Sequence, residues 1–326
     1  MAKPKVLVTR EISAEAIKRL KQHFVVDSNQ PDRPLSTTQL IRKLKGKDGV
    51  VTLTTDIISE AVLAKNPQLK IVSNVAVGYN NLDVVAATKR GVMMTNTPGV
   101  VDDTTADLTW ALILGAARGL SYGDRAIRAG KWKRWRMMEF LGQDIYGKTI
   151  GIVGFGRIGR GVARRAMGFN MKVLYASRSR ASDSVEQEFH ASYVDKHTLL
   201  RESDVVTLHL PLFPETRHYI GAKELAMMKK TAILVNASRG PIVDEKALVK
   251  ALKARRIAGA GLDVFEKEPA LTPGLITLPN VLLTPHIGSG SFETRLKMSN
   301  MAVTNCIAGL TGQRPPNLLN PDVFKL

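Results

Sequence analysis

A glycine-rich segment near the middle of the chain constrains the fold more than any other feature. Three glycines in the spacing G-x-G-x-x-G stand in the run Gly154-Phe155-Gly156-Arg157-Ile158-Gly159. The run follows an apolar segment typical of a buried strand and opens a segment typical of a helix that ends near Gly168. In that context the first glycine permits a tight turn, the second lets a pyrophosphate approach the backbone, and the third lets the helix pack against the strand. A glycine-rich structural turn is the alternative, but the flanking strand and helix favour dinucleotide binding.

Apolar runs at regular spacing predict that strands and helices alternate along the whole chain. After Gly147-Lys148, the runs typical of strands cover residues 149–153, 172–175, 205–208, 233–235, 261–264 and 281–283. In the first hundred residues, such runs cover residues 6–8, 50–53, 71–73 and 92–94. The intervening segments are long enough for helices, and Ser13 is placed to cap the first of them. The pattern predicts an α/β fold with two Rossmann-like, doubly wound parallel-sheet domains and a cleft between them.

The chain length and the pattern around residue 102 predict a discontinuous arrangement of domains. At 326 residues the chain exceeds what one hydrophobic core usually supports. The segment Asp102-Asp103-Thr104-Thr105 supplies N-capping side chains and negative charge ahead of an apolar helix expected over residues 106–120, where a new domain is expected to begin. A further helix is expected over residues 291–310. We therefore expect a substrate-binding domain of residues 1–101 and 287–326, and a dinucleotide-binding domain of residues 102–286.

The end of the strand after the glycine run bears on which dinucleotide binds. An NAD-preferring site places Asp or Glu there, about 20 residues after the glycines, to bond the ribose hydroxyls. This chain instead has Tyr175-Ala176-Ser177-Arg178-Ser179-Arg180. No carboxylate repels a 2′-phosphate there, and a hydroxyl and two guanidinium groups can bind it, so NADPH is the expected cofactor, with NADH possible. A solvated basic loop is the alternative and would leave the choice of cofactor open.

Three polar residues stand just beyond expected strands of the dinucleotide-binding domain: Arg239, Glu268 and His286. Open α/β sheets bind ligands at the carboxyl ends of their strands, so these side chains are expected to face a common ligand. Reduction of a 2-keto acid needs a cation for the carboxylate, an electrophile at the carbonyl oxygen and a proton donor. The three residue types together supply these functions, although each alone is typical of an ordinary turn or loop.

Several further motifs carry a family resemblance. They are Ala76-Val77-Gly78-Tyr79-Asn80, Asn96-Thr97-Pro98 and Gly147-Lys148-Thr149-Ile150-Gly151. With these motifs and the segments quoted above, in this order, the sequence resembles the D-isomer-specific 2-hydroxyacid dehydrogenase family, and most closely its glyoxylate/hydroxypyruvate reductase branch. The likeness covers essentially the whole chain and implies an NAD(P)-dependent oxidoreductase.

The resemblance also implies a role for individual residues. Arg239 would bind the substrate carboxylate and polarise the carbonyl, His286 would be the general acid in reduction, and Glu268 would orient its imidazole. Backbone N–H groups of Val77 and Gly78 would complete the substrate site. Asp263 would meet the nicotinamide carboxamide. The implied cofactor-binding residues are Thr105, Gly154, Gly156, Arg157, Ile158, Gly159, Ser177, Arg178, Ser179, Arg180, Leu210, Pro211, Asp263, His286 and Gly288.

The expected reaction is an NADPH-preferring reduction of glyoxylate to glycolate or of hydroxypyruvate to D-glycerate. Reduction of 2-ketogluconate, or of a phosphorylated keto sugar acid given the positive charge, is an alternative that the sequence does not separate from it. An alternative of another class is a binding protein that senses the nicotinamide dinucleotide, because transcriptional corepressors share this fold.

Composition and charge bear on partners and location. The net charge of +18 admits nucleic acid or an anionic small molecule, but the basic residues are scattered and no nucleic-acid-reading module is recognisable, so no nucleic acid is expected. The longest apolar stretch, residues 106–120, is too short to span a bilayer, so no membrane role is expected. The single cysteine, Cys306, cannot form an intrachain disulfide, and the first residues do not resemble a leader, so the expected location is cytoplasmic. No metal is expected.

Residues 132–141 bear on the oligomeric state. This segment is rich in tryptophan and methionine, and it resembles the loop that crosses between subunits in dimers of the same family. Its composition fits a protein interface, with packing inside the chain as the alternative. The family resemblance favours a homodimer.

Overall fold

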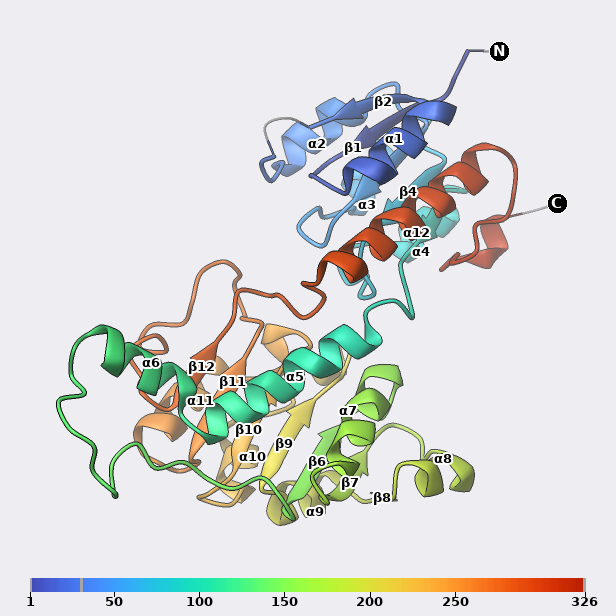
Figure 1. The fold of residues 1–326 in the computed structure, drawn as a ribbon. Helices are drawn as coiled ribbons and strands as arrows, with labels where there is room; N and C mark the ends of the chain where they lie inside the picture. The colour runs from blue at the N-terminus through green and yellow to red at the C-terminus, as the bar shows by residue number, and fades with distance from the viewer. Residues whose placement is uncertain (1, 30–31, 325–326) are drawn as a thin grey trace. The chain divides into compact units, whose positions relative to one another are not determined.

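The middle of the chain and its two ends form separate compact units (Figure 1). The computed structural model describes residues 2–29 and 32–324. Unit 1 consists of Met1–Val101 and Ser289–Leu326, and unit 2 consists of Asp102–Gly288. The second boundary falls after Gly288, whereas the sequence analysis placed it after residue 286. Each unit is built on one parallel sheet with accompanying helices, so the predicted α/β fold class is confirmed.

The sheet of unit 1 has the strand order β2-β1-β3-β4-β5 within the described residues. Its strands are β1 (Lys5–Val8), β2 (Val25–Ser28), β3 (Gly49–Thr52), β4 (Ile71–Asn74) and β5 (Met93–Thr95). Every residue of β3 and β4 is buried, as is usual for the inner strands of a parallel sheet, and this burial explains their apolar sequences. Thr52 pairs in register with Asn74, so the loops that follow β3 and β4 begin side by side.

The helices of unit 1 come from both ends of the chain. They are α1 (Ala14–His23), α2 (Thr37–Leu44), α3 (Glu60–Ala64), α4 (Val84–Lys89) and α12 (Phe292–Leu310). The side chain of Ser13 accepts a hydrogen bond from the N–H of Ala16, so the predicted cap of the first helix is confirmed. Helix α12 packs against α1 and β4, and this packing joins the last residues of the chain to the first hundred.

The sheet of unit 2 has the strand order β12-β11-β10-β9-β6-β7-β8 within the described residues. Its strands are β6 (Thr149–Val153), β7 (Lys172–Ala176), β8 (Ala191–Tyr193), β9 (Val205–Leu208), β10 (Ile233–Asn236), β11 (Gly259–Leu262) and β12 (Val281–Leu283). The strand order reverses between β6 and β9. In doubly wound sheets, ligands bind beyond the carboxyl ends of the strands at such a switch point.

The helices of unit 2 flank this sheet. They are α5 (Asp102–Ala117), α6 (Leu120–Arg128), α7 (Arg157–Met167), α8 (Asp183–Glu188), α9 (Lys196–Glu202), α10 (Ala222–Met227) and α11 (Glu245–Lys253). Helix α5 packs against α7, β10 and β11. It begins at Asp102 and ends at Ala117, so the expectation that residues 102–105 precede the helix was wrong: they form its first turn. No helix in the described ranges is long and apolar enough to cross a bilayer.

Two strands were missed by the sequence analysis, and both lie at an edge of a sheet. Strand β2 carries Asp27 and Ser28 and has no fully buried residue, and β8 has one buried residue, Ala191. Edge strands expose one side to solvent, so their sequences lack the continuous apolar run on which the prediction relied. Strand β11 also begins earlier than expected, at Gly259, because glycine and alanine give a weak strand signal.

Candidate active site

The glycine turn between β6 and α7 has the geometry that dinucleotide binding requires. Gly154 has a φ of +93°, and a Cβ there would lie 2.6 Å from the carbonyl oxygen of His209. A Cβ on Gly159 would lie 2.2 Å from the carbonyl oxygen of Gly154, so this glycine lets α7 pack against the turn. A Cβ on Gly156 would meet no atom within 4 Å. Packing therefore explains two of the glycines, whereas the third leaves open space at the N-terminus of α7, where a pyrophosphate fits.

Several of the residues expected to bind the cofactor are neighbours at the carboxyl edge of the same sheet. A Cβ built on Gly288 would lie 3.2 Å from Oδ2 of Asp263 and 3.6 Å from Cγ2 of Thr105, so these three residues adjoin. Leu210 follows β9, and its side chain would be 3.2 Å from a Cβ on Gly154. Strands β9 and β11 and helix α5 thus each place one of these residues at this edge.

The same edge of the sheet also carries Arg157, Ile158 and Pro211, and the surroundings of these three residues differ from one another. Nε of Arg157 lies 3.2 Å from Oδ2 of Asp102, and this ion pair joins the first turns of α7 and α5. Burial raises the pKa of Asp102, against the opposing effect of Arg157. Ile158 is partly buried in the first turn of α7, and Pro211 is exposed in the loop after β9.

The loop after β7 carries the residues expected to choose between NADPH and NADH. Arg180 makes two hydrogen bonds to the carboxylate of Glu186, at 2.9 and 2.7 Å, and the hydroxyl of Tyr175 donates to the same carboxylate. The bonds from Arg180 and Tyr175 hold the pKa of Glu186 down, to about 2. In the described part of the chain, no carboxylate pairs with Arg178. Of the two guanidinium groups, Arg178 is therefore the one without a competing anion.

The turn after β12 presents His286 beside a carboxylate. His286 has a φ of +53°, an uncommon conformation for a residue with a side chain, and its N–H donates to the carbonyl oxygen of Asp263 at 2.8 Å. Nδ1 of the imidazole lies 2.7 Å from Oε2 of Glu268. Among the described residues, Nε2 has no protein partner. The side chain is 36% exposed, so part of the ring is open to solvent.

Glu268 is held in place by both of its carboxylate oxygens. Oε1 accepts a hydrogen bond from the N–H of Phe265 at 3.0 Å, and Oε2 pairs with His286. Burial acts to raise the pKa of Glu268, but the hydrogen bonds and the positive charges of His286 and Arg239 outweigh it, so the pKa lies below its usual value of 4.5. Glu268 is therefore an ionised hydrogen-bond partner of the ring.

Arg239 lies in the turn after β10, close enough to Glu268 for their charges to interact. The side-chain amide of Asn236 donates to the carbonyl oxygen of Arg239 at 2.9 Å, and Nη1 of Arg239 donates to the carbonyl oxygen of Ser238 at 2.7 Å. Burial lowers the pKa of Arg239, and the charge of Glu268 offsets this effect only in part. Because the usual value is 12.5, the guanidinium remains a cation, and a partly buried cation is a suitable site for a carboxylate.

The fully buried side chain of Asp263 anchors the turn that carries His286. Its carboxylate accepts hydrogen bonds from the hydroxyl of Thr284 at 2.6 Å and from the N–H groups of Ile287 and Gly288, both at 2.8 Å. Burial raises the pKa of Asp263, and the hydrogen bonds offset this only in part. Residues on both sides of the histidine are therefore held by one carboxylate.

The sequence analysis missed two interactions that brace the loop of Glu268. Glu245, the first residue of α11, is 2% exposed, and its carboxylate accepts hydrogen bonds from the N–H of Glu266 at 2.7 Å and from the hydroxyl of Thr272. Nε2 of His218 lies 2.7 Å from Oε1 of Glu266. An acidic residue in the first turn of a helix and a histidine in a polar loop are both ordinary features, so no sequence signal marked them.

His209, by contrast, lies in a packed position. Nε2 of its ring is 2.9 Å from the hydroxyl of Thr207. Burial lowers the pKa of His209 to about 3, so the ring is neutral at physiological pH. Across residues 2–29 and 32–324, no group of three or more His, Cys, Asp or Glu side chains could hold a metal ion.

In unit 1, Val77 and Gly78 lie in the turn that follows β4. Both are partly buried. They stand at the carboxyl edge of the sheet, where a parallel sheet binds its ligands.

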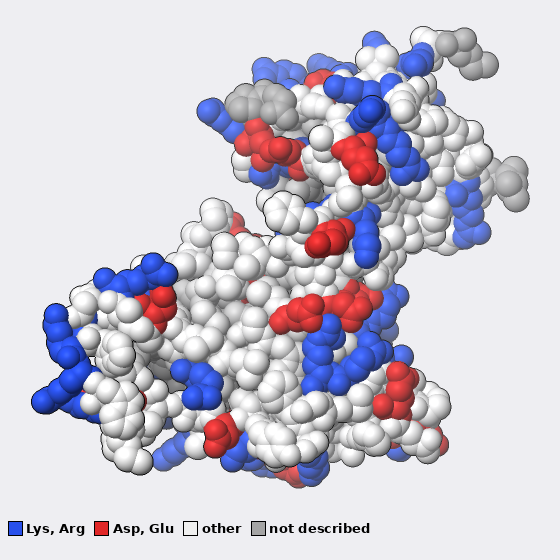
Figure 2. Space-filling view, in the orientation of Figure 1, with Lys and Arg blue, Asp and Glu red and all other residues white. Residues whose placement is uncertain are grey.

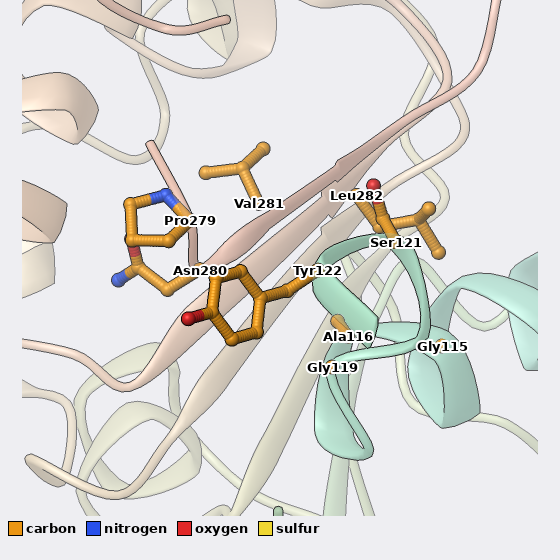
Figure 3. Close-up of a pocket in the computed structure, with 9 residues that line it drawn as sticks. All are labelled: Gly115, Ala116, Gly119, Ser121, Tyr122, Pro279, Asn280, Val281 and Leu282. Carbon is orange, nitrogen blue, oxygen red and sulfur yellow. The ribbon is translucent and has the colours of Figure 1, made fainter. Parts of the chain in front are cut away.

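A pocket of about 200 Å³ lies at the opposite end of β12 from His286 (Figure 3). Figure 3 shows Tyr122 of α6 facing the segment from Pro279 to Leu282, with glycine and alanine at the C-terminal end of α5 below it. The lining side chains include no acid, base or nucleophile suited to the chemistry above. This pocket is therefore separate from Arg239, Glu268 and His286.

The loop after α6 exposes large apolar side chains. Trp135, Met137 and Met138 are 75%, 76% and 76% exposed, respectively. The ring of Phe140 contacts that of Tyr122 on α6, with 5.4 Å between centroids. Figure 2 shows basic side chains gathered over this loop and mixed with acidic ones elsewhere on the visible face of unit 2. The alternative that this segment packs inside its own chain does not hold for these three side chains.

Three features together define the class of dinucleotide-dependent oxidoreductases. They are a doubly wound sheet, a glycine turn with room for a pyrophosphate, and an arginine, glutamate and histidine at the same edge. Comparison with known proteins agrees. Residues 110–288 match the family model described as D-isomer specific 2-hydroxyacid dehydrogenase, NAD binding domain. The chain belongs to the D-isomer specific 2-hydroxyacid dehydrogenase family, and the predicted family is confirmed.

Individual relatives cover almost the whole chain. The chain is 50% identical to a glyoxylate reductase of Pyrococcus horikoshii, over 99% of this chain and 98% of the relative. It is 51% identical to a glyoxylate reductase of Korarchaeum cryptofilum, with the same coverage of 99% and 98%. Among solved structures, it is similar to an NADPH-dependent glyoxylate/hydroxypyruvate reductase of Sinorhizobium meliloti in complex with NADP and malonate, with a TM-score of 0.89, 30% identity, and coverage of 100% of this chain and 99% of the other.

Proposed function

We propose that this protein catalyses the NADPH-preferring reduction of a small 2-keto acid, converting glyoxylate to glycolate and hydroxypyruvate to D-glycerate. The observation that carries the proposal is the contact of 2.7 Å between Glu268 and Nδ1 of His286, which leaves Nε2 of the imidazole for a ligand, together with the charge interaction between Glu268 and the guanidinium of Arg239. The names of the relatives, glyoxylate reductases at about half identity, support the choice of substrate.

In the proposed mechanism, each of the three side chains has one task. The guanidinium of Arg239 binds the substrate carboxylate and polarises the keto oxygen. Nε2 of the protonated His286 donates a proton to that oxygen as C2 accepts a hydride, so the carbonyl becomes a hydroxyl and the imidazole becomes neutral. Glu268 stabilises the imidazolium before transfer and holds the ring in one orientation. The bound nicotinamide dinucleotide supplies the hydride.

The cofactor would be held by residues of unit 2. The open space at Gly156 suits the pyrophosphate, and Thr105, Leu210, Asp263 and Gly288 would line the remainder of the site. The preference for NADPH rests on Ser177 and Arg178, with Arg180 held by Glu186. The NADPH-dependent relative with NADP bound supports this choice of cofactor.

Substrate binding is assigned to Val77 and Gly78 of unit 1 in addition to Arg239 and His286. The N–H groups of Val77 and Gly78 would bind the carboxylate.

We further propose a homodimer formed through residues 132–141, because Trp135, Met137 and Met138 expose more apolar surface than a solvated loop requires.

The proposed function is tested by a substrate panel of glyoxylate, hydroxypyruvate and 2-ketogluconate, each with NADPH and NADH at equal concentrations. We expect the highest kcat/KM with NADPH and one of the first two acids. His286→Ala and Arg239→Ala should each lower kcat/KM by a factor of about a thousand or more. Full activity in both variants would contradict the assigned roles, and a higher kcat/KM with NADH would contradict the cofactor preference.

A further inference from the structure

The turn that carries Val77 and Gly78 is held through its carbonyl groups. The carbonyl oxygen of Ala76 accepts a hydrogen bond from the N–H of Thr97 at 2.8 Å. The carbonyl oxygen of Val77 accepts one from Nδ2 of Asn96, also at 2.8 Å. Among the described residues, the N–H groups of Val77 and Gly78 donate to no protein acceptor. The carbonyls of this turn thus bind the body of unit 1, and two successive N–H groups stay open to a ligand.

The planarity of the peptide bond links these two facts. In a trans peptide, the C=O of one residue and the N–H of the next point in opposite directions. The bond to the carbonyl of Ala76 therefore sets the direction of the N–H of Val77. In the same way, the bond from Asn96 to the carbonyl of Val77 sets the direction of the N–H of Gly78. The N–H of Val77 therefore points away from Thr97, and the N–H of Gly78 points away from the side chain of Asn96.

Asn96 is itself firmly held. It is 8% exposed, and its backbone carbonyl oxygen accepts a hydrogen bond from Nδ2 of Asn305 on α12 at 3.2 Å. Asn74, which is fully buried, gives further support, because its Nδ2 donates to the carbonyl oxygen of Gly78 at 3.3 Å. The direction of the N–H of Gly78 thus depends on a side chain whose own position is fixed by neighbouring elements.

We propose that Asn96 is a positioning residue that directs the N–H of Gly78 toward the carboxylate of the substrate. This inference rests on the proposed function, since it assigns the open N–H groups to that carboxylate. The side-chain amide of Asn96 is engaged by Val77, so Asn96 acts through the turn without touching the substrate. Removing the amide leaves the peptide between Val77 and Gly78 free to rotate, and one of two hydrogen bonds to the carboxylate is weakened.

The test compares the wild-type protein with Asn96→Ala. Two readouts are used: the Kd for oxalate, measured by calorimetry on the protein saturated with NADPH, and the KM and kcat for glyoxylate. We expect the Kd for oxalate and the KM to rise about tenfold, which corresponds to one lost hydrogen bond of ordinary strength. The value of kcat should change less than about threefold, and the Kd for NADPH less than about twofold, because His286 and the glycine turn are unaltered.

Asn66→Ala is the matched control. Asn66 is also a buried amide of unit 1, 1% exposed, and its Nδ2 donates to the carbonyl oxygen of Val62 at 2.9 Å, away from the turn. This variant should lower Tm about as much as Asn96→Ala and leave the Kd for oxalate unchanged. If Asn96→Ala keeps wild-type affinity for oxalate, or if Asn66→Ala weakens it equally, the inference is overturned. Should Asn96→Ala fail to fold, Asn96→Ser decides by the same measurement, with about a threefold rise as the required minimum.

The calorimetric readout separates this inference from the proposed function. A wild-type protein that binds oxalate but reduces no 2-keto acid would contradict the proposed reaction, and the comparison of variants would still test Asn96. A wild-type protein that turns over glyoxylate with no effect of Asn96→Ala would contradict the inference alone.

Discussion

Two carboxylates hold His286 and the turn that carries it, and their surroundings give them different properties. Glu268 is partly exposed and hydrogen-bonded to the ring, and its pKa lies below the usual value. Asp263 is fully buried and bonds the backbone on the far side of the ring, and its pKa lies above the usual value. For Asp263 burial outweighs the hydrogen bonds. For Glu268 the hydrogen bonds from His286 and Phe265, with the charges of His286 and Arg239, together outweigh burial. Glu268 therefore holds the ring of His286, and Asp263 fixes the turn that carries it.

Glu268→Gln is predicted to lower kcat by a factor of about 10 to 100 while the Kd for NADPH stays within about twofold, because the amide cannot stabilise the imidazolium.

The pH dependence of unfolding gives a second measurement on Glu268→Gln. A carboxyl group with a lowered pKa in the folded protein stabilises it fully above the unfolded value of 4.5, and the stabilisation is lost as the pH falls through the lowered value. Wild type should therefore exceed Glu268→Gln in Tm near pH 7 and lose this advantage below about pH 4. A difference in Tm that is independent of pH would contradict the ionised pair.

Arg178 and Arg180 are predicted to contribute unequally to NADPH binding. Arg178→Ala should raise the Kd for NADPH about tenfold with little change for NADH, because a guanidinium that pairs with no carboxylate can bind the 2′-phosphate. Arg180→Ala should have a smaller effect on NADPH, since Glu186 already holds that guanidinium. Fluorescence titration of both variants with both dinucleotides measures this. Equal losses for NADPH and NADH in Arg178→Ala would assign the loop to an ordinary solvated surface.

At the scale of elements, the strand, turn and helix around the glycine run form the part of the fold that the sequence predicts best. Each glycine has a separate physical reason, and the structure distinguishes them. Gly159 is required by packing inside the protein, whereas Gly156 has ordinary backbone angles, φ −79° and ψ −164°, and open space around it. A substitution at Gly159 should therefore act on folding, and a substitution at Gly156 should act on ligand binding.

Gly156→Ala is predicted to keep a Tm within about 2 °C of wild type and to raise the Kd for the dinucleotide at least about tenfold, because the added methyl group occupies the space for the pyrophosphate. Gly159→Ala should lower Tm clearly, since its Cβ would lie 2.2 Å from the carbonyl oxygen of Gly154. Calorimetric unfolding and dinucleotide titration measure both variants. The prediction fails if Gly156→Ala binds the dinucleotide as wild type does.

The elements that the sequence did not predict share a physical property. Strands β2 and β8 lie at sheet edges, and their sequences, such as Val25-Val26-Asp27-Ser28, lack the continuous apolar run of the inner strands. The start of α5 was misplaced because Asp and Thr favour both the cap and the first turn of a helix.

At the scale of the whole molecule, the exposed loop of residues 132–141 is the feature that a single chain does not explain. The exposed apolar residues on this side of unit 2 also include Leu120 and Ile127 of α6, at 60% and 62% exposure. A surface of this character, with basic residues around it, is typical of a protein interface. The net charge of +18 disfavours nonspecific association of copies, so an interface must supply specific apolar contact.

The double variant Met137→Glu, Met138→Glu is predicted to convert a dimer into a monomer without unfolding it, because both side chains are exposed in the single chain and carry no core packing. Analytical ultracentrifugation at low and high protein concentration measures the change, and circular dichroism confirms the fold. The matched control is Ile57→Glu, at 55% exposure in unit 1, which should leave the oligomeric state unchanged. A wild-type protein that sediments as a monomer would contradict the proposed homodimer.

The sequence by itself determined the parallel α/β architecture and the presence of Arg239, Glu268 and His286 beyond its strands, because buried strands require continuous apolar runs and a sheet gathers the residues that follow them at one edge. It also marked the dinucleotide turn, because the G-x-G-x-x-G spacing stands between an expected strand and an expected helix. Only the tertiary structure decided how the candidate site is held. Asp263 bonds the turn of His286, Glu245 bonds the loop of Glu268, and in unit 1 Asn96 bonds the carbonyl oxygen of Val77. These contacts join residues far apart in the chain, and a hydrogen bond between distant residues leaves no trace in the local pattern of either.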